Sequence, residues 1–73
     1  MCLLDAKIGD LVRVVGFSGR KMTSKLQQVG IYPGDRLQVL RQAPLSGPML
    51  VKAGGREMAL GRGVAARILV EVE

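Results

Sequence analysis

Few side chains of this 73-residue chain are suited to catalysis, and their spacing does not form a site. The chain has no histidine, which is the usual general base and the usual nitrogen ligand of a metal ion. A serine or cysteine nucleophile therefore lacks its usual partner. The acidic residues closest in sequence, Asp5 with Asp10 and Glu71 with Glu73, could at most hold a hard cation weakly. We expect a protein that is not an enzyme and has no metal site and no cofactor.

One segment, residues 16–21 with the sequence GFSGRK, superficially resembles a glycine-rich phosphate-binding loop before a helix. It lacks the GxxxxGK[ST] spacing, and Met22 follows Lys21 where serine or threonine would be needed. We therefore interpret this segment as an ordinary loop that leads into a helix.

The single cysteine, Cys2, excludes an intramolecular disulfide and gives no sign of an oxidising compartment. We expect it to be an incidental thiol in a terminal segment that frays. The N-terminal sequence has no basic leader, and no apolar run approaches the roughly 18 residues that span a membrane. These features favour a soluble, cytoplasmic protein.

The net charge of +5 is compatible with nucleic acid, an acidic protein surface or anionic lipid as a partner. The basic residues are scattered, however, and the longest run of adjacent cations is the pair Arg20 and Lys21. A solvated basic surface is the simpler interpretation.

Hydrophobic periodicity predicts about five short strands and one helix in a single domain that spans residues 1–73. The strands are expected at residues 10–15, 36–41, 49–53, 56–60 and 68–73, with a single 3₁₀ turn at residues 62–66. Met22, Leu26 and Val29 recur at helical spacing and predict a helix over residues 20–29 with one apolar stripe. Ser18 is its expected N-cap and Gly30 its expected left-handed stop.

Turn residues complete this pattern. Pro33 and Gly34 suit a type II turn, and the pair Gly54 and Gly55 suits a tight hairpin. A further turn is expected at residues 43–48, and Leu40 interrupts the alternation of its strand, which indicates a bulge or burial on both faces. The inward side chains are expected to include Leu37, Val39, Met58, Leu60, Ile68, Val70 and Val72. Short strands with regular turns predict a small β-barrel.

The segment LQQVGIYPGD, residues 26–35, resembles a motif of the FeoA family, L-x-x-(apolar)-G-(apolar)-x-P-G. The similarity continues at residues 43–48, 58–62 and 65–68 and so covers nearly the whole chain. Ser46 stands where the family commonly has glycine, and Gly61 where it often has arginine. Both positions lie at or beside turns, so we expect the fold to be intact.

This resemblance implies a mainly β fold, an SH3-like barrel with one short inserted α-helix. It also implies an accessory or regulatory role in bacterial ferrous iron uptake, beside the membrane transporter FeoB and its cytoplasmic G-protein domain. Two alternatives are open. The same barrel forms the C-terminal domain of iron-dependent repressors of the DtxR type, and residues 8–14 resemble the first strand of nucleic-acid-binding KOW barrels. Because the expected sheet has no exposed aromatic side chains for stacking on bases, we expect no nucleic acid to bind.

Ferrous iron prefers a gathered set of imidazole, carboxylate or thiolate ligands, and this chain offers none. A module that binds the transporter, and shifts its conformational or nucleotide equilibrium, is therefore favoured over an iron carrier. We predict contact through the helix and its flanking turns, at Lys21, Lys25, Leu26, Gln28, Val29 and Tyr32. The competing interpretation places Leu26 and Val29 in the core and leaves Lys21 and Lys25 solvated. This fold would also allow the protein to form a weak homo-oligomer.

Overall fold

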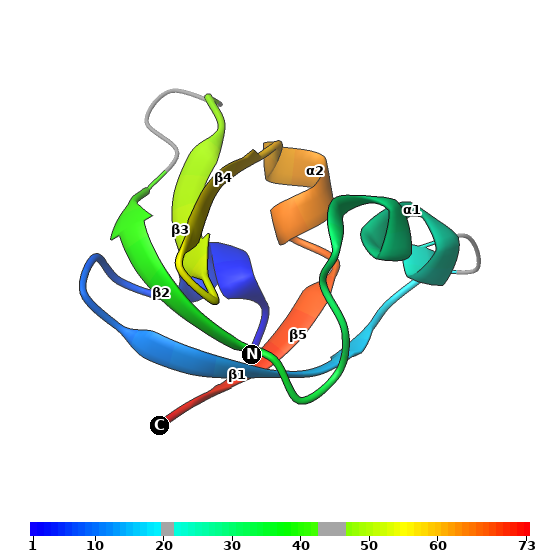
Figure 1. Cartoon of the computed structure of the whole chain (residues 1–73), viewed down its shortest axis with the longest axis horizontal. Coiled ribbons are helices and arrows are strands. Elements are labelled where there is room, and N and C mark those ends of the chain that lie inside the picture. The colour runs from blue at the N-terminus through cyan, green and yellow to red at the C-terminus, as the bar shows by residue number, and fades with distance from the viewer. Residues whose placement is uncertain (20–21, 43–46) are drawn as a thin grey trace.

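The computed structural model describes residues 1–19, 22–42 and 47–73, without the side chains at positions 22, 23 and 25. Within these residues, five strands form one antiparallel sheet in the order β4-β3-β2-β1-β5 (Figure 1). The strands are β1 Leu11–Phe17, β2 Arg36–Arg41, β3 Met49–Ala53, β4 Arg56–Leu60 and β5 Ile68–Val72. The helices are the 3₁₀ helix η1 Leu3–Asp5 and the α-helices α1 Met22–Val29 and α2 Arg62–Ala65.

The sheet curls around a common interior, and the segment that contains α2 connects its two end strands, β4 and β5 (Figure 1). The helix η1 contacts both β5 and α2, while α1 projects from one side of the body (Figure 1). In the described part of the chain β4 and β5 remain the edge strands, and the bridge between Cys2 and Leu69 covers part of the β5 edge, which would otherwise be free to pair with other chains. The predicted small, mainly β fold with a helix inserted between the first two strands is confirmed.

Among the described residues, the buried core contains no aromatic side chain, since the chain has only one phenylalanine and one tyrosine. The core's fourteen side chains are each at most 3% exposed: Leu3, Ala6, Val12, Val14, Leu26, Ile31, Leu37, Val39, Met49, Val51, Leu60, Ala65, Ile68 and Val70. The alternation in β2 and β5 correctly predicted four of them, and Leu60 in β4 is also confirmed. Met58 is half-buried. Val72 was expected inside but is 55% exposed, because it ends β5 beyond the residues covered by the N-terminus.

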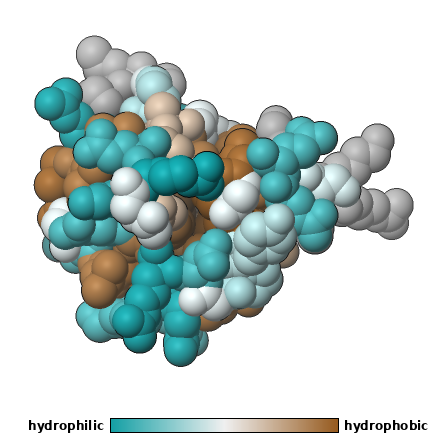
Figure 2. All heavy atoms as spheres, in the orientation of Figure 1, coloured by the Kyte–Doolittle hydropathy of each residue, from teal (hydrophilic) through white to brown (hydrophobic). Residues whose placement is uncertain are grey.

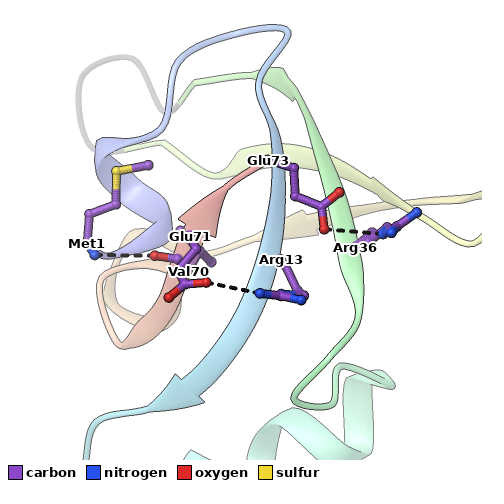
Figure 3. Close-up of polar contacts among 6 residues, drawn as sticks. All are labelled: Met1, Arg13, Arg36, Val70, Glu71 and Glu73. Carbon is purple, nitrogen blue, oxygen red and sulfur yellow. Dashed lines mark hydrogen bonds and ion pairs between the residues drawn. The ribbon is translucent and has the colours of Figure 1, made fainter.

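The prediction of a fraying N-terminus is wrong, because the first residues close the free edge of β5. Cys2 forms a β-bridge with Leu69, and the Met1 ammonium donates to the Val70 carbonyl at 3.2 Å (Figure 3). The Val70 amide in turn donates to the Met1 carbonyl at 2.8 Å. Leu3 follows and is fully buried. Burial of this side chain and satisfaction of the strand edge together hold the terminus in place.

Two of the strands contain irregularities in their pairing. Gly16 does not end the first strand: β1 continues to Phe17 through a register shift between Val14 and Gly16 against β5. The bulge predicted near Leu40 is confirmed by a register shift between Val39 and Arg41. Such bulges let a strand bend around a small core.

The turn after β4 is α-helical rather than 3₁₀. The Ala65 amide donates to the Gly61 carbonyl at 2.9 Å and the Ala66 amide to the Arg62 carbonyl at 3.0 Å, which are i to i−4 bonds. Ser18 is not the N-cap of α1, because Gly19, which follows it, has a non-helical φ of +106°. The Ser18 amide instead donates to the Arg67 carbonyl at 2.8 Å.

Candidate interaction site

The end of α1 is fixed by a glycine cap. Gly30 has a φ of +85°, its amide donates to the Gln27 carbonyl at 3.1 Å, and the Ile31 amide donates to the Leu26 carbonyl at 2.9 Å. This pair of bonds is the Schellman arrangement, and its usual apolar contact is available because Leu26 and Ile31 are both fully buried. The predicted left-handed stop at Gly30 is therefore confirmed.

A second turn follows at once and is tied to β1. The Asp35 amide donates to the Tyr32 carbonyl at 3.0 Å, and Gly34 has a φ of +94°, as the predicted type II turn requires. The Asp35 carboxylate accepts a hydrogen bond from the Tyr32 amide at 2.9 Å. The Gly34 amide donates to the Val14 carbonyl at 2.7 Å, and the Val14 amide donates to the Asp35 carbonyl at 2.8 Å. These bonds make the segment from α1 to β2 a rigid support.

The two turns direct apolar side chains outward on either side of Gly30. Val29 is 42% exposed and Tyr32 is 48% exposed, and Gln28 beside them is exposed as well. The competing interpretation of Val29 as a core residue is thus wrong, because Ile31 rather than Val29 continues the buried stripe after the turn. Three of the predicted contact residues are therefore exposed at or just after the end of α1.

The other predicted contact residues are placed differently. Leu26 is fully buried, so it supports the helix from the core and offers no surface to a partner. Lys25 lies in α1, but its side chain is outside the described part of the structure, and Lys21 is outside it altogether. The turn predicted at residues 43–48 also falls mostly outside the described residues.

A pocket of about 450 Å³, which the sequence did not predict, includes Gly30 in its lining. It lies between the α1–β2 turns and the β3–β4 hairpin and is lined by Gly30, Gly34, Asp35, Arg36, Ala53, Gly54 and Arg56. The hairpin has the predicted two-residue glycine turn, with φ values of +56° at Gly54 and +85° at Gly55. Glycines on both sides leave the space empty. The glycines at positions 30, 34 and 54 were a usable signal of this pocket. In the sequence, however, the need for turns was already a sufficient explanation of these glycines.

Arg56 lies directly against one wall of this pocket. A Cβ atom added at Gly30 would be only 2.9 Å from Arg56 Nη2, so the guanidinium occupies the space that a side chain would take. Gly30 therefore has two roles: it permits the left-handed conformation, and it makes room for the arginine.

Figure 3 shows the two ion pairs of the described residues, and neither involves Arg56. Arg13 meets Glu71 at 3.1 Å across β1 and β5, and Arg36 meets Glu73 at 3.2 Å. The Arg36 side chain is 70% exposed, so its pair contributes little to stability. All six carboxylates of the chain are described, and none lies within the 4.0 Å of an ion pair with Arg56.

The remainder of the described surface is mixed. On the face shown in Figure 2, apolar side chains emerge between polar ones. Residues 1–19, 22–42 and 47–73 contain no cluster of three or more His, Cys, Asp or Glu side chains suited to a metal ion. Among the residues that the structure describes, no helix has the length and hydropathy needed to cross a membrane.

Solved structures with the same fold include members of the metal-regulator class. The chain aligns over its full length with 41% of a manganese-dependent transcriptional repressor, at 25% identity and a TM-score of 0.87. A zinc complex of FeoA from Stenotrophomonas maltophilia, described as a procaryotic SH3 domain protein, is 22% identical with a TM-score of 0.77. The alignment covers 97% of the present chain and 89% of that protein, and it confirms the SH3-like fold.

Nearer relatives share both sequence and fold. A relative from Methanocaldococcus jannaschii named Fe(2+) transport protein A is 38% identical over 94% of this chain and 83% of its own length. The crystal structure of an iron uptake regulatory protein, FeoA, is 32% identical, with a TM-score of 0.87 and coverage of 100% and 97% of the two chains. The FeoA domain model matches residues 1–72, and the chain therefore belongs to the FeoA family.

Proposed function

We propose that this protein is a non-enzymatic accessory component of ferrous iron uptake that binds the cytoplasmic G-protein region of a FeoB-type transporter. Binding would shift the conformational or nucleotide equilibrium of the transporter. Membership of the FeoA family supports the link to ferrous iron transport. The S. maltophilia relative is itself described in connection with activation of bacterial ferrous iron transport.

The observation that carries this proposal is the pair of exposed side chains Val29 and Tyr32 on the rigid end of α1. Tyrosine is enriched among residues that dominate binding energy, and a side chain on a fixed backbone loses less conformational entropy on binding. Gln28 adds a polar contact at the edge of this pair. We include Lys21 and Lys25 because their positive charges would steer an acidic partner surface.

The test is co-purification with the cytoplasmic region of the transporter. We expect the double variant Val29→Ser, Tyr32→Ser to bind at least about ten times more weakly, because it removes both apolar contacts. The matched control is Val72→Ser, which changes an apolar residue that is 55% exposed and lies away from the helix. Circular dichroism would verify the fold of each variant.

Two results would contradict this choice of surface. One is full binding by the double variant, and the other is an equal loss in the Val72→Ser control. The variant Lys21→Glu, Lys25→Glu tests these two charges separately, and we expect it to slow association more strongly at low salt than at high salt.

A second candidate is a regulatory domain that acts with a DNA-binding partner. The specific observation in its favour is the fold shared with the manganese-dependent repressor. Steeply salt-dependent binding of the chain to DNA would favour this candidate. A FeoB-type gene beside that of this protein would favour the transport function.

A further inference from the structure

We propose that the pocket between the α1–β2 turns and the β3–β4 hairpin binds a carboxylate group, held by the Arg56 guanidinium. The natural source would be an Asp or Glu side chain of a protein partner. Only this choice of source rests on the proposed function, because binding of the carboxylate itself depends on the pocket alone.

Arg56 is suited to this role by its position and by its lack of an ionic partner. It lines the pocket and lies against Gly30, yet none of the described carboxylates pairs with it. A guanidinium presents a planar fork of donors that matches the two oxygens of a carboxylate. An exposed but unpaired fork inside a concave site can therefore donate hydrogen bonds to an anionic group.

Three backbone amides of the pocket lining are already engaged within the chain. The amides of Gly30, Gly34 and Asp35 already donate to carbonyl groups of the same chain, at 3.1, 2.7 and 3.0 Å. Phosphate sites are usually built from several free backbone amides that converge on one point. Recognition in this pocket must instead come chiefly from its arginine side chains.

The charges of the pocket favour one negative charge over two. Arg36 is already paired with Glu73 at 3.2 Å, and Asp35 adds a carboxylate to the lining. Arg56 is then the one cation of this lining without a described ionic partner. A carboxylate would neutralise Arg56, whereas a doubly charged phosphate would leave one negative charge uncompensated and would be repelled more strongly by Asp35. We therefore infer a carboxylate.

The surroundings suggest which carboxylate would bind best. Gly30 and Gly34 line the pocket, and the exposed residues Val29 and Tyr32 are close to these glycines in the chain. An acidic side chain with an apolar neighbour could place its carboxylate on Arg56 and its apolar neighbour on this surface. This combination would orient the partner as well as attract it.

The experiment is an NMR titration of the full chain at constant ionic strength. The probes are N-acetylglutamate N-methylamide for a side-chain carboxylate, N-acetylglycine for a terminal carboxylate, and inorganic phosphate. We expect saturable shifts of the Gly30, Gly34 and Gly54 amides with the carboxylates, and weaker binding of phosphate. Stronger binding of phosphate than of either carboxylate would overturn the assignment, as would the absence of saturable shifts.

Variants locate the binding group. We expect Arg56→Gln to weaken carboxylate binding at least tenfold and Arg56→Lys to weaken it less, because lysine keeps the charge but loses the fork. The matched control, Arg41→Gln, removes one charge from an exposed residue outside the pocket and should bind normally. Unchanged binding in Arg56→Gln would refute the proposal. The titration contains no transporter, so its failure would refute the carboxylate site without bearing on the proposed function. If the chain binds carboxylates but does not co-purify with the transporter, only the proposed function is refuted.

Discussion

Replacing Gly30 with alanine tests the central feature of this structure, the glycine that both caps α1 and seats Arg56. Alanine would have to adopt the φ of +85° that Gly30 has, and its Cβ would lie 2.9 Å from Arg56 Nη2. The first effect strains the backbone, and the second displaces a guanidinium at the end of a long side chain. Both effects destabilise the folded protein.

The expected loss of stability follows from these two effects. A left-handed conformation costs a residue with a Cβ about 1–2 kcal/mol. Alanine recovers about 0.5 kcal/mol by reducing the entropy of the unfolded chain, and the exposed Arg56 can move at little cost. We therefore expect a loss of about 1 kcal/mol, which lowers the melting temperature of a domain of this size by about 4–8 °C.

Two matched substitutions separate the causes. Gly34→Ala carries the same backbone strain at a φ of +94°, with nothing within 4 Å of the new Cβ, so it should show a similar loss. Gly63→Ala lies in α2 without positive φ and also meets nothing within 4 Å, so it should stabilise the protein by about 0.5–1 kcal/mol. Urea unfolding would measure all three variants. A Gly30→Ala variant as stable as the parent would refute the account of this cap.

Other predictions concern the core, the N-terminus and the surface, each measured by urea unfolding. Leu26→Ala should cost about 2–5 kcal/mol because Leu26 is fully buried, whereas Val29→Ala should cost less than about 0.5 kcal/mol. Leu3→Ala should also cost about 2–5 kcal/mol, and a negligible effect would show that the N-terminus does not join the core in solution. Arg13→Gln should cost less than about 1 kcal/mol because the side chains of its pair with Glu71 are 51% and 61% exposed, and a larger, salt-sensitive loss would contradict this.

Local patterns in the sequence were sufficient for most of the secondary structure. The alternation in residues 36–41 predicted β2 and its inward Leu37 and Val39, because side chains of a strand point to opposite faces in turn. Gly30 and the pair Gly54 and Gly55 were predicted as turns for a similarly local reason, since few other residues tolerate positive φ. The same motifs carried the resemblance to the FeoA family.

Features that depend on distant segments were not predictable in this way. Leu3 looked like part of a loose terminus, and its burial depends on the edge of β5, more than sixty residues later in the chain. Val29 fitted the apolar stripe of α1, but the Schellman turn brought Ile31 into the core in its place. Helical periodicity says which side chains share a face, and not where the chain leaves that face.

The candidate site shows the same division. Sequence alone was enough to place a rigid glycine turn after the helix, to predict a small β fold and to suggest Gln28, Val29 and Tyr32 as contacts, because each of these rests on neighbouring residues. The position of Arg56 against Gly30 depended on the folded sheet, which brings the β3–β4 hairpin beside a turn some twenty residues earlier in the chain. Long-range packing of this kind leaves no periodic trace, so the pocket became visible only in three dimensions.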